Sequence, residues 1–170
     1  MIINNLLHKK TVEMFLLKFS ELKLVLNAED SKRGLTAFHD ACANGHSNIV
    51  DIIMQKSAEL NIKMDSKETK KGQTPFHFAC IDGRSKIVEM FLKRSIELNI
   101  DLNSKDQSGM TGFHLACVYG KTSIVEMIID NADSSNIDLK AKTWARKTAF
   151  QIATDKVKEL IKKKMPTIAM

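Results

Sequence analysis

The sequence contains no apolar run close to the roughly 20 residues that a membrane-spanning helix needs. Its first ten residues place their charges after the apolar residues, which is unlike a secretory signal. Only three cysteines occur, at regular intervals, and this pattern does not predict a disulfide framework. We therefore expect an intracellular protein, located in the cytoplasm, with the nucleus as the alternative.

Signatures of chemistry are also absent. The chain has no Cys-x-x-Cys pair, no glycine-rich phosphate loop and no converging Ser/His/Asp set, because each candidate residue recurs in several copies. We expect no catalytic residue, no cofactor and no metal site, so an enzyme is the weakest of the function classes considered.

Positive charge is scarce over most of the chain and concentrated near its end. Residues 1–139 hold 17 basic and 18 acidic residues, whereas residues 140–170 hold nine basic and two acidic ones. The net charge of +6 therefore belongs to the last segment. A general affinity for nucleic acid is not expected from so local an excess.

A seven-residue motif is present in several copies. It reads T-x-F-H-x-A-C at Thr36–Cys42, Thr74–Cys80 and Thr111–Cys117, and a degenerate copy covers Thr148–Thr154. The threonines are 38, 37 and 37 residues apart, and glycines and Ile-Val pairs recur at fixed offsets from them. Such a period is typical of stacked supersecondary units.

The motif resembles the ankyrin repeat, whose T-P-L-H-x-A signature matches Thr74–Ala79 with Phe76 in place of leucine. The resemblance extends from about residue 8 to about residue 161. It implies an all-α solenoid of stacked helix-turn-helix units with hairpin fingers, with three full repeats between partial caps. The units here are longer than the family's usual length of about 33 residues.

We expect one domain over residues 1–170. Its units are a partial N-terminal unit and finger (1–33), three repeats (34–71, 72–108 and 109–145) and a degenerate C-terminal cap with a basic tail (146–170). Helical spacing of apolar residues in the first unit predicts a helix over about residues 12–22.

Each repeat is expected to contain a short helix A and a longer helix B. Helix A begins at the motif threonine, which can cap it, and ends at a glycine. Helix B is predicted at Ser47–Lys56, Ser85–Arg94 and Ser123–Asn131, and a last one at about Lys156–Met165. Alternating apolar residues at 60–64 and 98–102 then predict extended chain.

The repeated histidines and cysteines are expected to be structural. Neighbouring helices pack about 8–10 Å apart, so His39, His77 and His114 are too widely spaced to share a zinc ion. The resemblance implies that such a histidine hydrogen-bonds adjacent finger and helix backbones. The cysteines are predicted to be small buried side chains that form no disulfide.

Variable positions are better candidates for function, because repeated positions build the stack. The resemblance implies a concave face made of the finger tips and the exposed side of helix A, here called the finger face. We predict that it binds a protein partner, that Phe78, Tyr119 and Trp144 are the main anchors, and that lysines in the second finger attract an acidic partner. The predicted contact residues are Asp40, Asn44, Lys70, Lys71, Phe78, Ile81, Asp82, Leu115, Val118, Tyr119 and Trp144. The alternative for Phe78 and Leu115 is that they cover gaps between repeats.

Two alternatives to this monomeric scaffold remain open from the sequence. The near absence of a first helix A suggests a regulatory module cut from a longer signalling or cytoskeletal protein. The basic helix over Lys156–Met165 suggests an electrostatic adaptor for nucleic acid or an anionic membrane.

Overall fold

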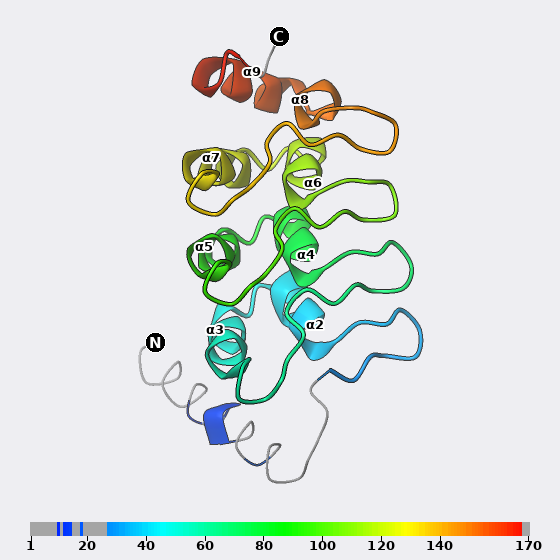
Figure 1. Ribbon diagram of the computed structural model, residues 1–170, viewed down its shortest axis with the longest axis vertical. Helices are drawn as coiled ribbons and strands as arrows, with labels where there is room; N and C mark the ends of the chain where they lie inside the picture. Colours follow the sequence, from blue (N-terminus) through cyan, green and yellow to red (C-terminus); the bar gives the residue numbers. More distant parts are fainter. Residues whose placement is uncertain (1–9, 11, 15–17, 19–26, 168–170) are drawn as a thin grey trace.

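The computed structural model describes residues 10, 12–14, 18 and 27–167. Two parallel columns of helices form the stack, and a looped finger precedes each helix of the first column (Figure 1). The first column contains α2 (Ala37–Asn44), α4 (Pro75–Asp82), α6 (Gly112–Val118) and α8 (Ala149–Ile152). The second contains α3 (Ser47–Lys56), α5 (Ser85–Arg94), α7 (Thr122–Asn131) and α9 (Asp155–Lys164).

The expected all-α solenoid is confirmed, since no strand forms among the described residues and only Lys142 and Thr148 pair as an isolated bridge. In both columns, each helix packs on the next helix of the same column. The helix expected over residues 12–22 lies largely outside the described residues.

Helix A starts where its motif threonine predicts. In α4, the side chain of Thr74 accepts a hydrogen bond from the backbone N–H of His77, and the His77 ring accepts one from the backbone N–H of Thr74. This reciprocal capping box satisfies two N–H groups that a helix start leaves free. The helix then ends at Gly83, whose φ of 70° lies in the left-handed region that glycine tolerates best.

The core runs along the inside of both columns. Phe91 of α5 packs between the rings of Phe38 and Phe76, with centroid distances of 5.8 and 5.3 Å. Gly112, the first residue of α6, lies so close to Phe76 that a β-carbon there would come within 2.5 Å of its ring. Aromatic side chains thus join successive repeats, and a small residue makes room for them.

The segments after helix B are not extended as the alternating pattern predicts. The side chains of Ile62 and Met64 are buried, as expected, but Asn61 between helix and finger has a φ of 50°. Asn99 and Asn136 repeat this left-handed turn with φ of 51° and 53°. Asparagine tolerates this conformation better than most residues. The turn places alternate side chains toward the core and toward solvent, as a strand would.

The C-terminal unit is a shortened repeat. Helix α8 has four residues, and Arg146 takes the left-handed place of the finger glycine with φ of 59°. In α9, Val157 and Ile161 are buried against the stack, while the Lys164 ammonium bonds to Asp130 of α7 at 2.7 Å and to Glu126 at 3.0 Å. The helix stops just before Pro166, as predicted.

Candidate functional site

The fingers form a continuous row along the first helix column (Figure 1). Each finger after the first donates one backbone hydrogen bond to the finger before it: Thr69 to Arg33 at 2.8 Å, Gln107 to Lys71 at 2.8 Å, and Trp144 to Ser108 at 3.2 Å. The tips are therefore held at fixed spacing, and their side chains are presented side by side.

An acidic residue at the base of each of the first three fingers fixes the turn. Asp30, Glu68 and Asp106 accept hydrogen bonds from backbone N–H groups of their own fingers. Burial raises the pKa of Glu68, but the N–H groups of three finger residues outweigh it and hold that pKa below its usual range. Among the described residues, these carboxylates form no salt bridge with the lysines at the tips.

The motif histidines of α2 and α4 connect their helix to the next finger. The Nε2 atom of His39 lies 3.2 Å from the carbonyl oxygen of Gln73, and that of His77 lies 3.1 Å from the carbonyl oxygen of Met110. These two bonds confirm the structural role. At the last interface, Nε2 of His114 has no partner among the described residues. Burial lowers the pKa of all three histidines, so neutral imidazole is the favoured form.

The motif cysteines are buried free thiols. Burial raises the pKa of Cys117 to about 12 and raises those of Cys42 and Cys80 as well. A thiol that stays protonated is a poor nucleophile and a poor metal ligand. Within the described part of the chain, no three His, Cys, Asp or Glu side chains are placed to hold a metal ion.

The structure places the predicted contact residues at different depths. Phe78 and Ile81 are half-buried, and Leu115 is only 3% exposed. The remaining eight are exposed: Asp40, Asn44, Lys70, Lys71, Asp82, Val118, Tyr119 and Trp144.

A hollow on the finger face brings four of these residues together. It has a volume of about 230 Å³ and lies between the second finger, the third finger and α6. Its lining includes Lys71, Leu115, Val118 and Tyr119, together with Gln73, Asp106, Gln107, Ser108 and Met110. Tyr119 is 50% exposed and Val118 is 36% exposed at its edge.

Trp144 lies on the next finger, whose backbone bonds to Ser108 of the hollow. Trp144 is 65% exposed, and the Lys105 ammonium lies 4.6 Å from the centroid of its ring. The backbone of Trp144 also sits directly against Gly109, where a β-carbon would collide with it. The indole is thus held outward next to the hollow, whereas Asp40 and Asn44 lie on α2 and do not line it.

Comparison with known families agrees with this geometry. A family model of three ankyrin repeats matches residues 2–106, and a model of a single ankyrin repeat matches residues 108–142. The chain belongs to the ankyrin repeat family. Ankyrin repeats are generally protein–protein interaction modules and are typically not catalytic. No curated protein matches the chain.

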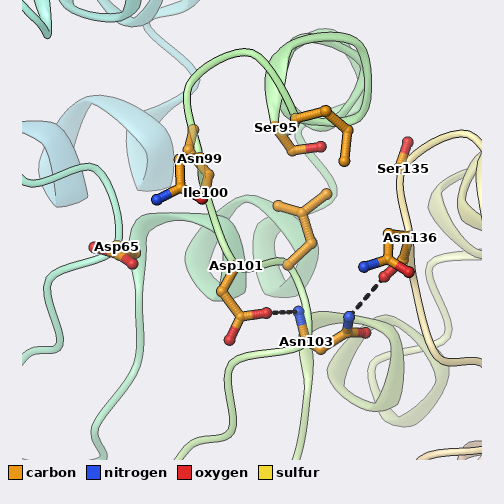
Figure 2. Close-up of a pocket in the computed structure, with 10 residues that line it drawn as sticks. Asp65, Ser95, Asn99, Ile100, Asp101, Asn103, Ser135 and Asn136 are labelled. Carbon is orange, nitrogen blue, oxygen red and sulfur yellow. Dashed lines mark hydrogen bonds between the residues drawn. The ribbon is translucent and has the colours of Figure 1, made fainter.

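This ankyrin array has a larger hollow elsewhere, which the sequence did not indicate. It has about 400 Å³ and lies between the turns that follow α5 and α7, lined by residues such as Asp65, Ser95 and Asn103 (Figure 2). The Asn103 amide already donates to the carbonyl oxygen of Asn136 at 2.7 Å, and Ser135 donates to that of Leu92 at 2.8 Å. These two bonds join neighbouring ankyrin repeats, so we assign this hollow to the stack, although Ser95 Oγ in its lining has no partner among the described residues.

No helix in the described residues of the array has the length and apolar character needed to cross a membrane. Trp144, Tyr119 and Val118 belong to neighbouring elements on one face, and this clustering makes the finger face the candidate site.

Proposed function

We propose that the chain is a non-catalytic scaffold that binds a partner protein on the finger face. The observation that supports this function most strongly is that exposed Val118 and Tyr119 line one hollow, while exposed Trp144 lies on the next finger, which bonds to Ser108 of that hollow. Tryptophan and tyrosine are the residues that most often supply binding energy in protein interfaces. Tyr119 at the end of α6 and Trp144 on a bonded finger are both presented by fixed elements, at little conformational cost.

The charges of the second finger support an acidic partner. Lys70 and Lys71 are exposed and form no ion pair with any described residue. The carboxylate nearest in sequence, that of Glu68, is buried and bonded to the backbone of its own finger. Unneutralised cations at the edge of an interface mainly raise the association rate with acidic partners.

The test is capture of partner proteins from a cell extract by the wild-type chain and by a Tyr119→Ala/Trp144→Ala variant. Both side chains are mainly exposed, so the variant should retain its helical CD signal and its melting temperature. Ile96→Ala is the matched control, because Ile96 is 65% exposed but follows α5, away from the fingers. Capture should be lost with the double variant and kept with the control. Equal capture by all three proteins would reject the finger face.

A second candidate, an electrostatic adaptor, is supported by the outer side of α9. Lys156, Lys162 and Lys163 are exposed and unpaired among the described residues, whereas Lys164 is held by α7. Changing these three lysines to glutamate keeps the buried side of α9 intact. Binding to RNA or to anionic vesicles that weakens with salt and disappears in this variant would support the adaptor.

We further propose that the chain works as a monomer inside the cell. Three buried, unpaired cysteines are consistent with a reducing compartment. Light scattering coupled to gel filtration tests the monomer: a mass that rises with protein concentration would contradict it.

A further inference from the structure

Two equivalent interfaces on the finger face are filled differently. Phe78 in α4 and Leu115 in α6 both lie four residues after their capping threonines. At the first interface, the Phe78 ring meets the His39 ring edge-on at a centroid distance of 5.8 Å. The guanidinium carbon of Arg33, from the first finger, lies 5.9 Å from the centroid of the same ring. A phenyl ring and a cation therefore close this interface.

The second interface lacks both groups. Leu115 replaces Phe78, and Lys71 replaces Arg33 at the position before the finger glycine. Leu115 is almost fully buried, and the hollow of about 230 Å³ opens where this pair meets Val118 and Tyr119. A protein cavity of about 150 Å³ is large enough to bind benzene. The hollow therefore has room for the ring that the first interface contains and the second lacks.

Lys71 lines the hollow and Lys70 lies beside it, so an acidic residue next to that ring would meet cations there, although the carboxylate of Asp106 also lines the hollow. Asp106 faces the hollow, but its Oδ1 already accepts hydrogen bonds from the N–H of Ser108 at 2.8 Å and of Met110 at 2.9 Å. Lys71 at the hollow and Lys70 beside it have no carboxylate partner in the described structure. A lysine ammonium can interact both with an aromatic face and with a carboxylate placed next to it.

We propose that this hollow receives one aromatic side chain from an extended partner segment, and that an acidic residue adjacent to it in the segment pairs with Lys70 and Lys71. The inference rests on the proposed scaffold function and specifies the part of the partner that is recognised. The Phe78 ring at the first interface shows the packing that the partner's aromatic ring reproduces at the second.

Leu115→Phe is the variant that tests this most sharply. It fills the hollow from inside with the side chain already present at the equivalent position, so the fold and melting temperature should be preserved or improved. Random linear peptides displayed on phage would be selected on the wild-type chain, with Leu115→Phe used for counter-selection. We expect enriched peptides to share one Phe, Tyr or Trp next to Asp or Glu.

A synthetic copy of an enriched peptide then gives the magnitudes. Its affinity should fall at least about tenfold on Leu115→Phe, and by a similar factor when its aromatic residue is changed to alanine. A Lys70→Gln/Lys71→Gln variant should bind more weakly and show less salt dependence. Ile96→Ala should bind like the wild type.

Other outcomes would overturn the inference. Enrichment without an aromatic residue, equal binding to Leu115→Phe, or no enrichment at all would each reject the hollow as an aromatic site. If a peptide binds Leu115→Phe but not Tyr119→Ala/Trp144→Ala, the hollow is rejected as the binding site and the finger face is retained. If a peptide binds both variants as well as it binds the wild type, both proposals are rejected. If an RNA oligonucleotide binds the wild type but not Leu115→Phe, the hollow receives a nucleobase and the proposal of a protein segment is wrong.

Discussion

Helix α6 and its surroundings contain two regions that differ in repetition and in exposure to solvent. His114 and Cys117 repeat in each full unit, are buried, and serve the stack. Tyr119, two residues later, and Trp144 on the next finger do not repeat and are 50% and 65% exposed. Repetition therefore identifies the residues that build this molecule, and departure from repetition identifies the surface available to a partner. Changes in the two regions should have opposite consequences for stability and binding.

The largest expected effect on stability comes from the repeated region. Phe76 is 2% exposed and packs against both Phe91 and the bare backbone of Gly112. Phe76→Ala should lower the free energy of unfolding by about 3–5 kcal/mol, because it removes a ring that joins two repeats. Urea unfolding followed by CD measures this. A loss below about 1 kcal/mol would mean that the ring is not part of the core.

Acid should destabilise the repeated region through its histidines. Burial holds the pKa of His39, His77 and His114 below the ordinary value of 6.5, so the folded chain favours neutral rings more than the unfolded chain does. The unfolded state then binds more protons below pH 6.5, and stability is full above that pH and declines as pH falls below it. Urea midpoints measured between neutral and mildly acidic pH should show this fall.

The degenerate unit supplies a control for that experiment. In α8 the capping box uses Gln151, whose Oε1 accepts a hydrogen bond from the N–H of Thr148 at 3.0 Å. Replacing the three histidines by glutamine keeps the cap and removes the titrating group. The decline below pH 6.5 should then shrink, and an unchanged decline would assign it to other groups.

A smaller effect on the free energy of unfolding is expected at Asp65, where the equivalent position of the neighbouring units holds asparagine. Asn27 and Asn103 each form a clamp of two hydrogen bonds to the turn of the next unit. The Asn103 side chain donates to the carbonyl oxygen of Asn136, and its Oδ1 accepts from the N–H of Asp138 at 2.8 Å. Asp65 occupies the same place between them and makes no such bond within the described residues. Asp65→Asn should raise the free energy of unfolding by about 1 kcal/mol.

The reverse change gives the comparison for this clamp. Asn103→Asp should lower stability by a similar amount, because a carboxylate cannot donate to the Asn136 carbonyl. If Asp65→Asn leaves the urea midpoint unchanged while Asn103→Asp lowers it, the two turns are not equivalent.

The smallest effect on stability is expected in the variable region. Tyr119→Ala should change the free energy of unfolding by less than about 0.5 kcal/mol, since half of the side chain already faces solvent. The same variant should nevertheless bind enriched peptides more weakly. A loss of stability as large as that of Phe76→Ala would remove the distinction between the two regions.

Local signals made much of the fold predictable. The capping threonines and helix-ending glycines are short-range features, and helix B was predicted with the observed bounds at Ser47–Lys56 and Ser85–Arg94. The turns at Asn61 and its equivalents were missed because alternation in burial does not distinguish a strand from a left-handed turn. The regular placement of acidic residues before the finger glycines would have revealed the finger-base carboxylates.

The candidate site was only partly predictable. Variable positions in helix A and the fingers indicated the correct elements and left open whether Leu115 covers a gap between repeats, but they did not indicate that Lys71 would meet Tyr119 at a hollow. The hollow depends on a size difference between Phe78 and Leu115 and on the stacking of two fingers from different units. Such an arrangement arises only when the repeats are assembled.

The claim that this ankyrin array meets its partner on the finger face is tested most directly by placing a photo-cross-linking amino acid at position 119 and, separately, at position 96. Both positions are exposed apolar sites, but only Tyr119 lies on the finger face. After irradiation in a cell extract, we expect a discrete cross-linked protein with the probe at position 119 and none with the probe at position 96. Cross-linking only from position 96, or equally from both, would contradict the account.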